Sequence, residues 1–252
     1  MLIAGPEFNK TIPKRTESVI FTDTKAPDGA TLTDVSEAQD GSIVAWLDGT
    51  TYKVSTQESG VKVFANPDLS YMFDGNENTA CENLTNIDVT NLDTSQVTDM
   101  SYMFDSAGYS ASIFTLDLSG WDTSQVTDMT YMFAYTGTKS SIFTIKGLSS
   151  WDTSKVTNMS YMFGLAGRNA STFTLDLSNW DTSKVTNMYC MFTFAGYEAN
   201  AFNLDLSNWS IDKKADIEDI FYDAGYNATE WNIDCSSWAL WNQIPNQRLS
   251  IH

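Results

Sequence analysis

Carboxylate side chains recur along this chain at a nearly fixed spacing, and they are its most frequent groups capable of chemistry. Four aspartates open copies of an Asp-Thr-Ser motif and lie 29 or 30 residues apart: Asp93, Asp122, Asp152 and Asp181. Carboxylates stacked about 4.8 Å apart repel each other unless they share a cation or hydrogen-bond donors. The row is therefore a candidate calcium site. The alternative is an Asx turn, in which each carboxylate accepts the N–H group two residues further on.

A second charged row runs through the alternating segment of each repeat. Its members are Asp88, Asp117, Lys146, Asp176, Asp205 and Asp234. Two residues before each of them comes a Thr or Asn: Asn86, Thr115, Thr144, Thr174, Asn203 and Asn232. We expect both rows on one broad polar surface, the concave face of the molecule, where Lys146 relieves repulsion between its neighbours. This surface is either a solvated sheet face or a site that binds hydroxyls, calcium or basic groups.

A third row lies in the turn before each of these segments. Tyr109, Thr138, Arg168, Tyr197 and Tyr226 share one position of the repeat. Exposed Tyr and Arg side chains on loops are typical of interface anchors. They are equally typical of loop residues that lean on a neighbouring repeat. We include Tyr109, Arg168, Tyr197 and Tyr226 among the candidate binding residues.

Catalytic chemistry has little support in this sequence. The single histidine is His252, at the last position, which excludes His-based triads and His-ligated metal sites. Cys81, Cys190 and Cys235 match neither a zinc spacing nor a disulfide framework. We expect three free thiols that are mostly packed, no enzyme activity, and no cofactor apart from possible calcium.

A repeat of 29 residues positions all of these groups. Five tryptophans mark it: Trp121, Trp151, Trp180, Trp209 and Trp238. Five phenylalanines keep the same interval: Phe104, Phe133, Phe163, Phe192 and Phe221. Ladders of identical aromatic residues predict stacking in a core shared by about six copies. The one interval of 30 coincides with an extra residue, Gly147, which predicts a bulge.

Each repeat predicts one short strand and one short helix. Residues 114–118 alternate apolar and polar side chains, as a half-buried strand does. Met100, Met103, Phe104 and Ala107 follow the i, i+3, i+4, i+7 spacing of one helix face. Neither element can bury its apolar side alone, so the expected fold is an α/β solenoid of stacked repeats.

The ends of the chain depart from the repeat. Residues 1–63 predict an N-terminal cap: a flexible arm over 1–16, a possible strand over 17–22, and a β-hairpin whose turn is Asp48-Gly49. The repeats occupy residues 64–238. Residues 239–252 contain enough apolar side chains to form a C-terminal cap, which a solenoid needs to cover its last core layer.

Composition limits the partners and the compartment. The chain has 252 residues with 32 acidic and 14 basic side chains, a formal net charge of −18, which disfavours nucleic-acid backbones and anionic membranes. Its 42% hydrophobic content is too high for a disordered chain. No apolar stretch of membrane-spanning length occurs. Met1–Pro6 lack the features of a signal peptide, so we expect a mature, trimmed or otherwise exported chain.

The segment Leu175–Met188, followed by Met191-Phe192, resembles the BspA-type leucine-rich repeats of bacterial surface proteins, and the resemblance extends over residues from about 64 to 238. Residues 34–49 are similar to the segment that precedes such repeats in that family. The resemblance implies a right-handed leucine-rich-repeat solenoid, an extracellular or cell-surface location, and adhesion to host or matrix molecules. It implies no catalytic motif.

The expected function is therefore non-catalytic recognition or adhesion, in which the strand face and the loops bind a host or matrix protein or glycan. One alternative is a phage-borne receptor-binding or decoration protein. Another is an acidic rod that mimics DNA and occupies a basic protein groove. Nucleic acid and membrane insertion are not expected, and the oligomeric state stays open.

Overall fold

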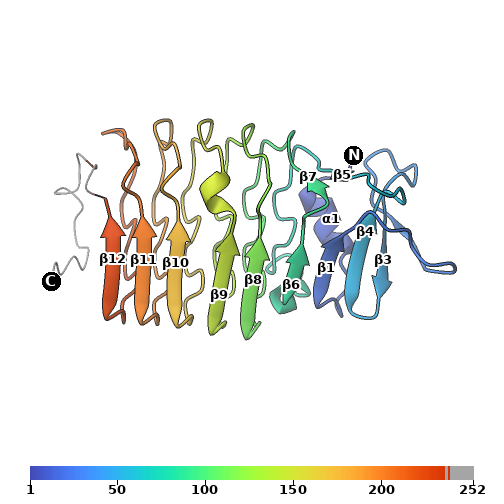
Figure 1. Ribbon diagram of the computed structural model, residues 1–252, viewed down its shortest axis with the longest axis horizontal. Coiled ribbons are helices and arrows are strands. Elements are labelled where there is room, and N and C mark those ends of the chain that lie inside the picture. The colour runs from blue at the N-terminus through green and yellow to red at the C-terminus, as the bar shows by residue number, and fades with distance from the viewer. Residues whose placement is uncertain (236–237, 239–252) are drawn as a thin grey trace.

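The alternating segment of each repeat forms a strand in the computed structural model, which describes residues 1–235 and 238. The strands are β6 (Asn86–Asp88), β8 (Ile113–Asp117), β9 (Ile142–Lys146), β10 (Thr172–Asp176), β11 (Ala201–Asp205) and β12 (Glu230–Asp234). They stand side by side in one row (Figure 1). Bonded neighbours pair in parallel with matched positions, so that Thr115 lies beside Thr144 and Leu175 beside Leu204. The chain is thus a β-solenoid with repeating coils of about 29 residues.

The segment predicted as a helix in each repeat is a run of tight turns. Met100, Met103 and Phe104 are fully buried, as the predicted helix face required. The backbone is not helical, because Tyr102 and Ser106 have φ values of 56° and 58°, in the left-handed region. The prediction of one helix per repeat is therefore wrong. Among the described residues, α1 (Gly5–Thr11) is the one α-helix, and two short 3-10 turns accompany it, η1 (Cys81–Asn83) and η2 (Leu148–Ser150).

Hydrogen bonds between coils explain this difference. The N–H groups of alternate residues in the turn segment donate to carbonyl oxygens of the next coil, with N···O distances of 2.8–3.0 Å. The pairs are Met100 with Asp128, Tyr102 with Thr130, and Phe104 with Met132. Only the intervening N–H groups bond within their own turn, as Met103 does to the Met100 oxygen at 3.3 Å. An α-helix would keep all of these bonds internal.

Coils are consequently spaced alike on both sides of the solenoid. Bonded strands lie about 4.8 Å apart, whereas packed helices need roughly 8–10 Å. A helix in every repeat would spread one side and curve the stack. Here the strands form a straight row, so the predicted concave surface is instead flat (Figure 1). The leucine-rich-repeat assignment is not confirmed.

Aromatic ladders fill the core, as the repeat predicts. Successive tryptophans from Trp121 to Trp238 stack with ring centroids 6.0–6.4 Å apart, and each has 6% or less of its surface exposed. The phenylalanines from Phe104 to Phe221 stack at 5.3–5.5 Å. The Trp180 indole N–H also donates to the Leu148 oxygen at 2.8 Å. Each coil thus seals the core of its neighbour.

The N-terminal residues complete the strand row. The hairpin β3 (Val44–Asp48) and β4 (Thr51–Ser55) is confirmed, although Asp48 pairs with Thr51 and the turn is therefore Gly49-Thr50. The predicted extra strand is β1 (Ser18–Phe21), which pairs in parallel with β4 on one side and β6 on the other. Short strands β2 (Thr33–Asp34), β5 (Val63–Phe64) and β7 (Leu92–Asp93) finish the cap region.

Residues 1–16 do not form the predicted flexible arm. Helix α1 lies here, and the side chains of Leu2 and Phe8 are fully buried. The Asn9 amide donates to the Asp74 carbonyl oxygen at 3.0 Å, which holds α1 against the first coils. The predicted C-terminal cap, 239–252, lies outside the described residues.

The extra glycine interrupts the strand ladder. Seven strands form one sheet that ends at β9, and β10 begins a second sheet of three. Gly147 follows β9 with a φ of 89° and leads into η2. The predicted bulge is therefore a left-handed glycine followed by a 3-10 turn.

Two aspartates are buried in adjacent coils near α1. Asp74 and Asp105 have 2% and 5% of their surface exposed, and the Ser106 hydroxyl donates to Asp105 at 3.2 Å. Burial, together with the neighbouring Asp74 carboxylate, raises the pKa of Asp105 to about 7. Burial likewise raises the pKa of Asp74 to about 6. The folded state therefore favours the protonated carboxyl groups.

Replacing Trp180 by Ala should lower the free energy of unfolding by about 3–5 kcal/mol, because it truncates a fully buried ring between two stacked neighbours. Chemical denaturation measures this. The outward Asp176→Asn control should change stability by less than about 0.5 kcal/mol. A loss near zero for Trp180→Ala would contradict the aromatic ladder.

Stability should also fall as the pH rises through the pKa of Asp105. Because the folded-state pKa is raised from 3.8 to about 7, the stabilisation is complete below pH 3.8 and is lost by about pH 7. Asp105→Asn should flatten this decline and be more stable than wild type at pH 8. Thermal unfolding from pH 4 to pH 8 tests this. Asp28→Asn removes the same formal charge at an exposed position, and equal pH slopes for both variants would contradict the assignment.

Candidate functional site

The strand face presents its polar side chains in straight rows. Strands β8 and β10 alternate exposed and buried positions, so that their odd-numbered and even-numbered outward residues, respectively, face solvent. Because bonded strands pair in register, the outward residues of each coil align with those of the next. The predicted Thr and Asn row and the predicted charged row therefore run across one surface.

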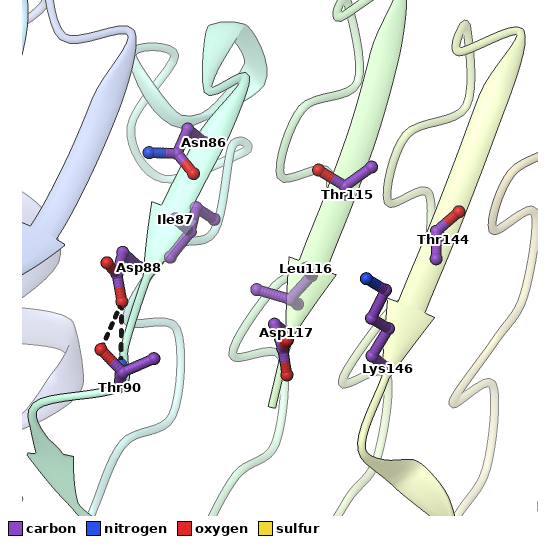
Figure 2. A pocket seen from close by; sticks show the side chains of 9 residues that line it. All are labelled: Asn86, Ile87, Asp88, Thr90, Thr115, Leu116, Asp117, Thr144 and Lys146. Atoms are coloured by element: carbon purple, nitrogen blue, oxygen red, sulfur yellow. Dashed lines mark hydrogen bonds between the residues drawn. The ribbon is translucent and has the colours of Figure 1, made fainter. Parts of the chain in front are cut away.

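A shallow hollow of about 250 Å³ lies on this face between β6, β8 and β9. Figure 2 shows its residues in two polar lines over an apolar floor. The first line is Asn86, Thr115 and Thr144, and the second is Asp88, Asp117 and Lys146. Ile87 and Leu116 form the floor, and Thr90 closes one corner.

The two carboxylates of the hollow are held by their own turns. Asp88 accepts the Thr90 N–H at 3.0 Å and the Thr90 hydroxyl at 2.8 Å. Asp117 accepts the Ser119 N–H at 2.9 Å. Hydrogen bonds from Ser119, with a smaller contribution from Lys146, hold the pKa of Asp117 below its usual value. This carboxylate is therefore ionised at neutral pH.

Lys146 occupies the place that aspartate takes in the other coils. Within the described part of the chain, the ion pairs are Lys10 with Glu7 and Lys53 with Asp48, and Lys146 forms none. Its side chain runs back along β9 toward the level of Thr144 (Figure 2). The hollow thus contains an ammonium group without a carboxylate partner.

The hydroxyl groups at the centre of the Thr and Asn row also lack partners. Toward β12, the Asn232 amide donates to Asn203 at 2.8 Å, and Asn203 donates to the Thr174 hydroxyl at 3.3 Å. Toward β1, the Asn86 amide donates to the Ser18 hydroxyl at 3.0 Å. Between these two chains, neither Thr115 nor Thr144 has a side-chain hydrogen bond to any described residue. The hollow therefore has free donors and acceptors.

The aspartates of the Asp-Thr-Ser row form Asx turns. Each accepts the N–H of the serine two residues on at 2.9–3.0 Å: Asp93, Asp122, Asp152 and Asp181. The motif's threonine joins coils, since the Thr94 hydroxyl donates to the Asp122 oxygen and accepts the Asp122 N–H. Over residues 1–235 and 238, no three Asp, Glu, His or Cys side chains converge as a metal site. Calcium binding by this row stays a prediction.

The loop residues lean on one another along a different part of the coil. Arg168 lies 4.6 Å from the Tyr197 ring centre, and Tyr197 stacks on Tyr226 at 4.8 Å. Tyr109 carries Lys139 over its ring at 4.8 Å. None of these residues lines the hollow. The loops are thus a second exposed row, separate from the strand-face site.

The structure selects among the predicted strand-face residues. Asp117 and Lys146 come together in the hollow. Asp176, Asp205 and Asp234 lie on β10–β12, beyond the interruption of the sheet, and do not line it. The partners that the prediction of individual site residues omitted are Asn86, Asp88, Thr115 and Thr144. Their shared repeat position was the available signal, and what it lacked was the location of the hollow.

The cysteines are free and buried, as predicted. Burial raises the pKa of the Cys190 thiol and raises that of Cys235 to about 12. A thiol with a raised pKa is a poor nucleophile at neutral pH. Cys190 is therefore a packing residue in this fold.

Gly147 shapes the end of the strand that carries Lys146, and replacing it by Ala should destabilise the protein. An added Cβ would meet the Ser119 nitrogen at 2.4 Å. Gly120 has a similar φ of 84° in open space, so Gly120→Ala should cost only the left-handed backbone energy of about 1–2 kcal/mol. Chemical denaturation should show a clearly larger loss for Gly147→Ala. Equal losses would contradict the close approach.

None of the described helices has the length and apolar character that crossing a bilayer requires. Comparison with known proteins yields one family, described as "Mycoplasma protein of unknown function, DUF285", which matches residues 67–168 and again 135–248. No curated protein and no solved structure matches the chain. The two matched segments together span most of the chain and coincide with the repeating coils, so this protein belongs to the DUF285 family.

Proposed function

We propose that this protein is a non-catalytic recognition module that binds carbohydrate through the hollow between β6, β8 and β9. The observation that carries the proposal is the set of unpaired polar groups at its centre, Thr115, Thr144 and Lys146. Hydroxyl groups donate and accept hydrogen bonds, an ammonium group donates them, and the flanking carboxylates accept them. Neighbouring hydroxyls of a sugar need this mixture of partners.

The rigidity of the strand face supports binding of a small polar ligand. The hollow's side chains project from bonded strands, and the intervening Leu116 is anchored in the core with 2% of its surface exposed. Binding to such a surface orders few side chains, which lowers its entropic cost. A weak polar ligand can therefore be held without a deep pocket.

The chemistry of the hollow favours binding over catalysis. A general acid needs a carboxyl group whose pKa is raised toward neutrality. The aspartates with that property, Asp74 and Asp105, are buried beneath α1 and do not line the hollow. The pKa of Asp117, which does line it, is lowered.

The resemblance to BspA-type surface proteins favours a role in adhesion at a bacterial surface, with a host or matrix glycan as the ligand. A protein partner is the second candidate. It is favoured by the loop row, where Arg168, Tyr197 and Tyr226 stack in the manner of interface anchors.

The test is binding of the purified chain to an array of glycans and matrix proteins, with and without calcium. The Thr115→Val/Thr144→Val double variant removes both free hydroxyls and keeps the β-branched shape. We expect it to lose about tenfold or more in affinity for the glycan, about 1.4 kcal/mol, with an unchanged Tm. Thr172→Val, an exposed change on β10, is the matched control and should bind normally.

Each other outcome on the array has a defined reading. Glycan binding that survives the double variant, or an array without glycan hits, would overturn the proposal. Hits confined to proteins would move the site to the loop row, where Tyr197→Ala should then abolish them. Binding that requires calcium would assign the Asp-Thr-Ser row as its ligand.

A further inference from the structure

We infer that the hollow selects sugars that carry a carboxylate group, and that Lys146 is the residue that binds this group. The inference rests on the proposed carbohydrate function and narrows its ligand class. It depends on three features of the site: the isolation of the Lys146 charge, the two hydroxyls beside it, and the acidity of the surrounding surface.

Lys146 differs from the other lysine of the same row. The outward row runs from Lys53 on β4 through Ile20 and Asp88 to Asp117 and Lys146. Lys53 is satisfied by Asp48, with a nitrogen–oxygen distance of 2.8 Å. Lys146 has no such partner among residues 1–235 and 238. An ammonium group that protein carboxylates leave unpaired can pair with a carboxylate of the ligand.

The nearby aspartates do not occupy this ammonium group. Asp88 and Asp117 bond to Thr90 and Ser119 in their own turns. Their carboxylates lie at one end of the hollow, whereas the Lys146 nitrogen lies toward the Thr115 and Thr144 end (Figure 2). The ammonium is therefore directed toward the hydroxyl row.

Two hydroxyls adjoin this charge at a fixed separation. Thr115 and Thr144 pair directly across β8 and β9, which places them about 4.8 Å apart. They suit ring hydroxyls of a sugar whose carboxylate reaches Lys146. Ile113 and Ile142 precede them on the same face with 48% and 49% of their surface exposed. These side chains supply an apolar patch for the C–H groups of the ligand.

The acidic surroundings limit the ligand to one negative charge. The chain carries a net charge of −18, and the next coils place Asp176 and Asp205 in the same row. Screening over about 8 Å at physiological salt weakens their effect on a single nearby carboxylate. A polyanion crossing several coils would meet these aspartates directly. Mono-acidic sugars therefore fit the site, and densely sulfated chains do not.

NMR titration of the isotope-labelled full chain tests this inference, with the methyl signals of Ile113 and Ile142 as reporters. The probes are the methyl glycosides of N-acetylneuraminic acid and glucuronic acid, each compared with its neutral methyl ester. Wild type should bind at least one acid about tenfold more tightly than its ester. Lys146→Gln should abolish this preference, whereas Lys53→Gln, a lysine of the same row, should preserve it.

The outcomes separate this inference from the proposed function. Equal binding of acid and ester by wild type, or a preference that survives Lys146→Gln, would overturn the role of Lys146 and leave carbohydrate binding standing. If no probe shifts the reporter signals and the array is blank, both proposals fail. If Lys146→Gln loses acid and ester alike, Lys146→Arg decides: restored acid preference supports the role of the charge, and no restoration overturns it.

Discussion

Hydrogen bonding between successive coils is the constraint on which this structure depends. The strand segment and the turn segment of each coil both bond to the next coil. Both sides of the solenoid therefore advance by the strand spacing of about 4.8 Å per coil. A chain built this way has a straight stack, a flat strand face, and identical side chains directly above one another. The aromatic ladders follow from that alignment, because a ring in one coil can stack only on the same ring in the next.

The same alignment explains why polar residues recur with the repeat. The Asp-Thr-Ser motif combines two structural tasks: its aspartate closes an Asx turn, and its threonine hydroxyl bonds to the next coil. The acidic row at the strand ends closes turns in the same way at Asp88, Asp176 and Asp205. Much of the net negative charge thus arises from residues that shape turns. The structural role of these aspartates also makes a departure from them informative.

Lys146 and Gly147 are that departure. The coil that contains them has one additional residue, a basic group in place of an acidic one, and a left-handed glycine in place of the serine that would close the turn. The strand ladder ends at this coil, and the hollow lies beside it on β6, β8 and β9. A regular solenoid offers every coil the same surface, so a binding site needs a break in the pattern. The inserted glycine and the lysine supply this break.

The sequence by itself determined the repeat length, the inward aromatic ladders, the alternating strands, the hairpin and the odd coil at Gly147, because each depends on side-chain type and spacing along the chain. Only the tertiary structure decided that the segment around Met100–Ala107 is a run of turns. A turn segment bonded to its neighbours buries the same positions as a helix, and the periodicity of apolar residues is blind to where the backbone N–H groups donate. The location of the hollow was decided there too. Residues such as Asn86, Thr144 and Lys146 are about 30 or more residues apart in sequence or belong to separate coils, and which of them stay unpaired depends on how side chains in adjacent coils bond across the sheet.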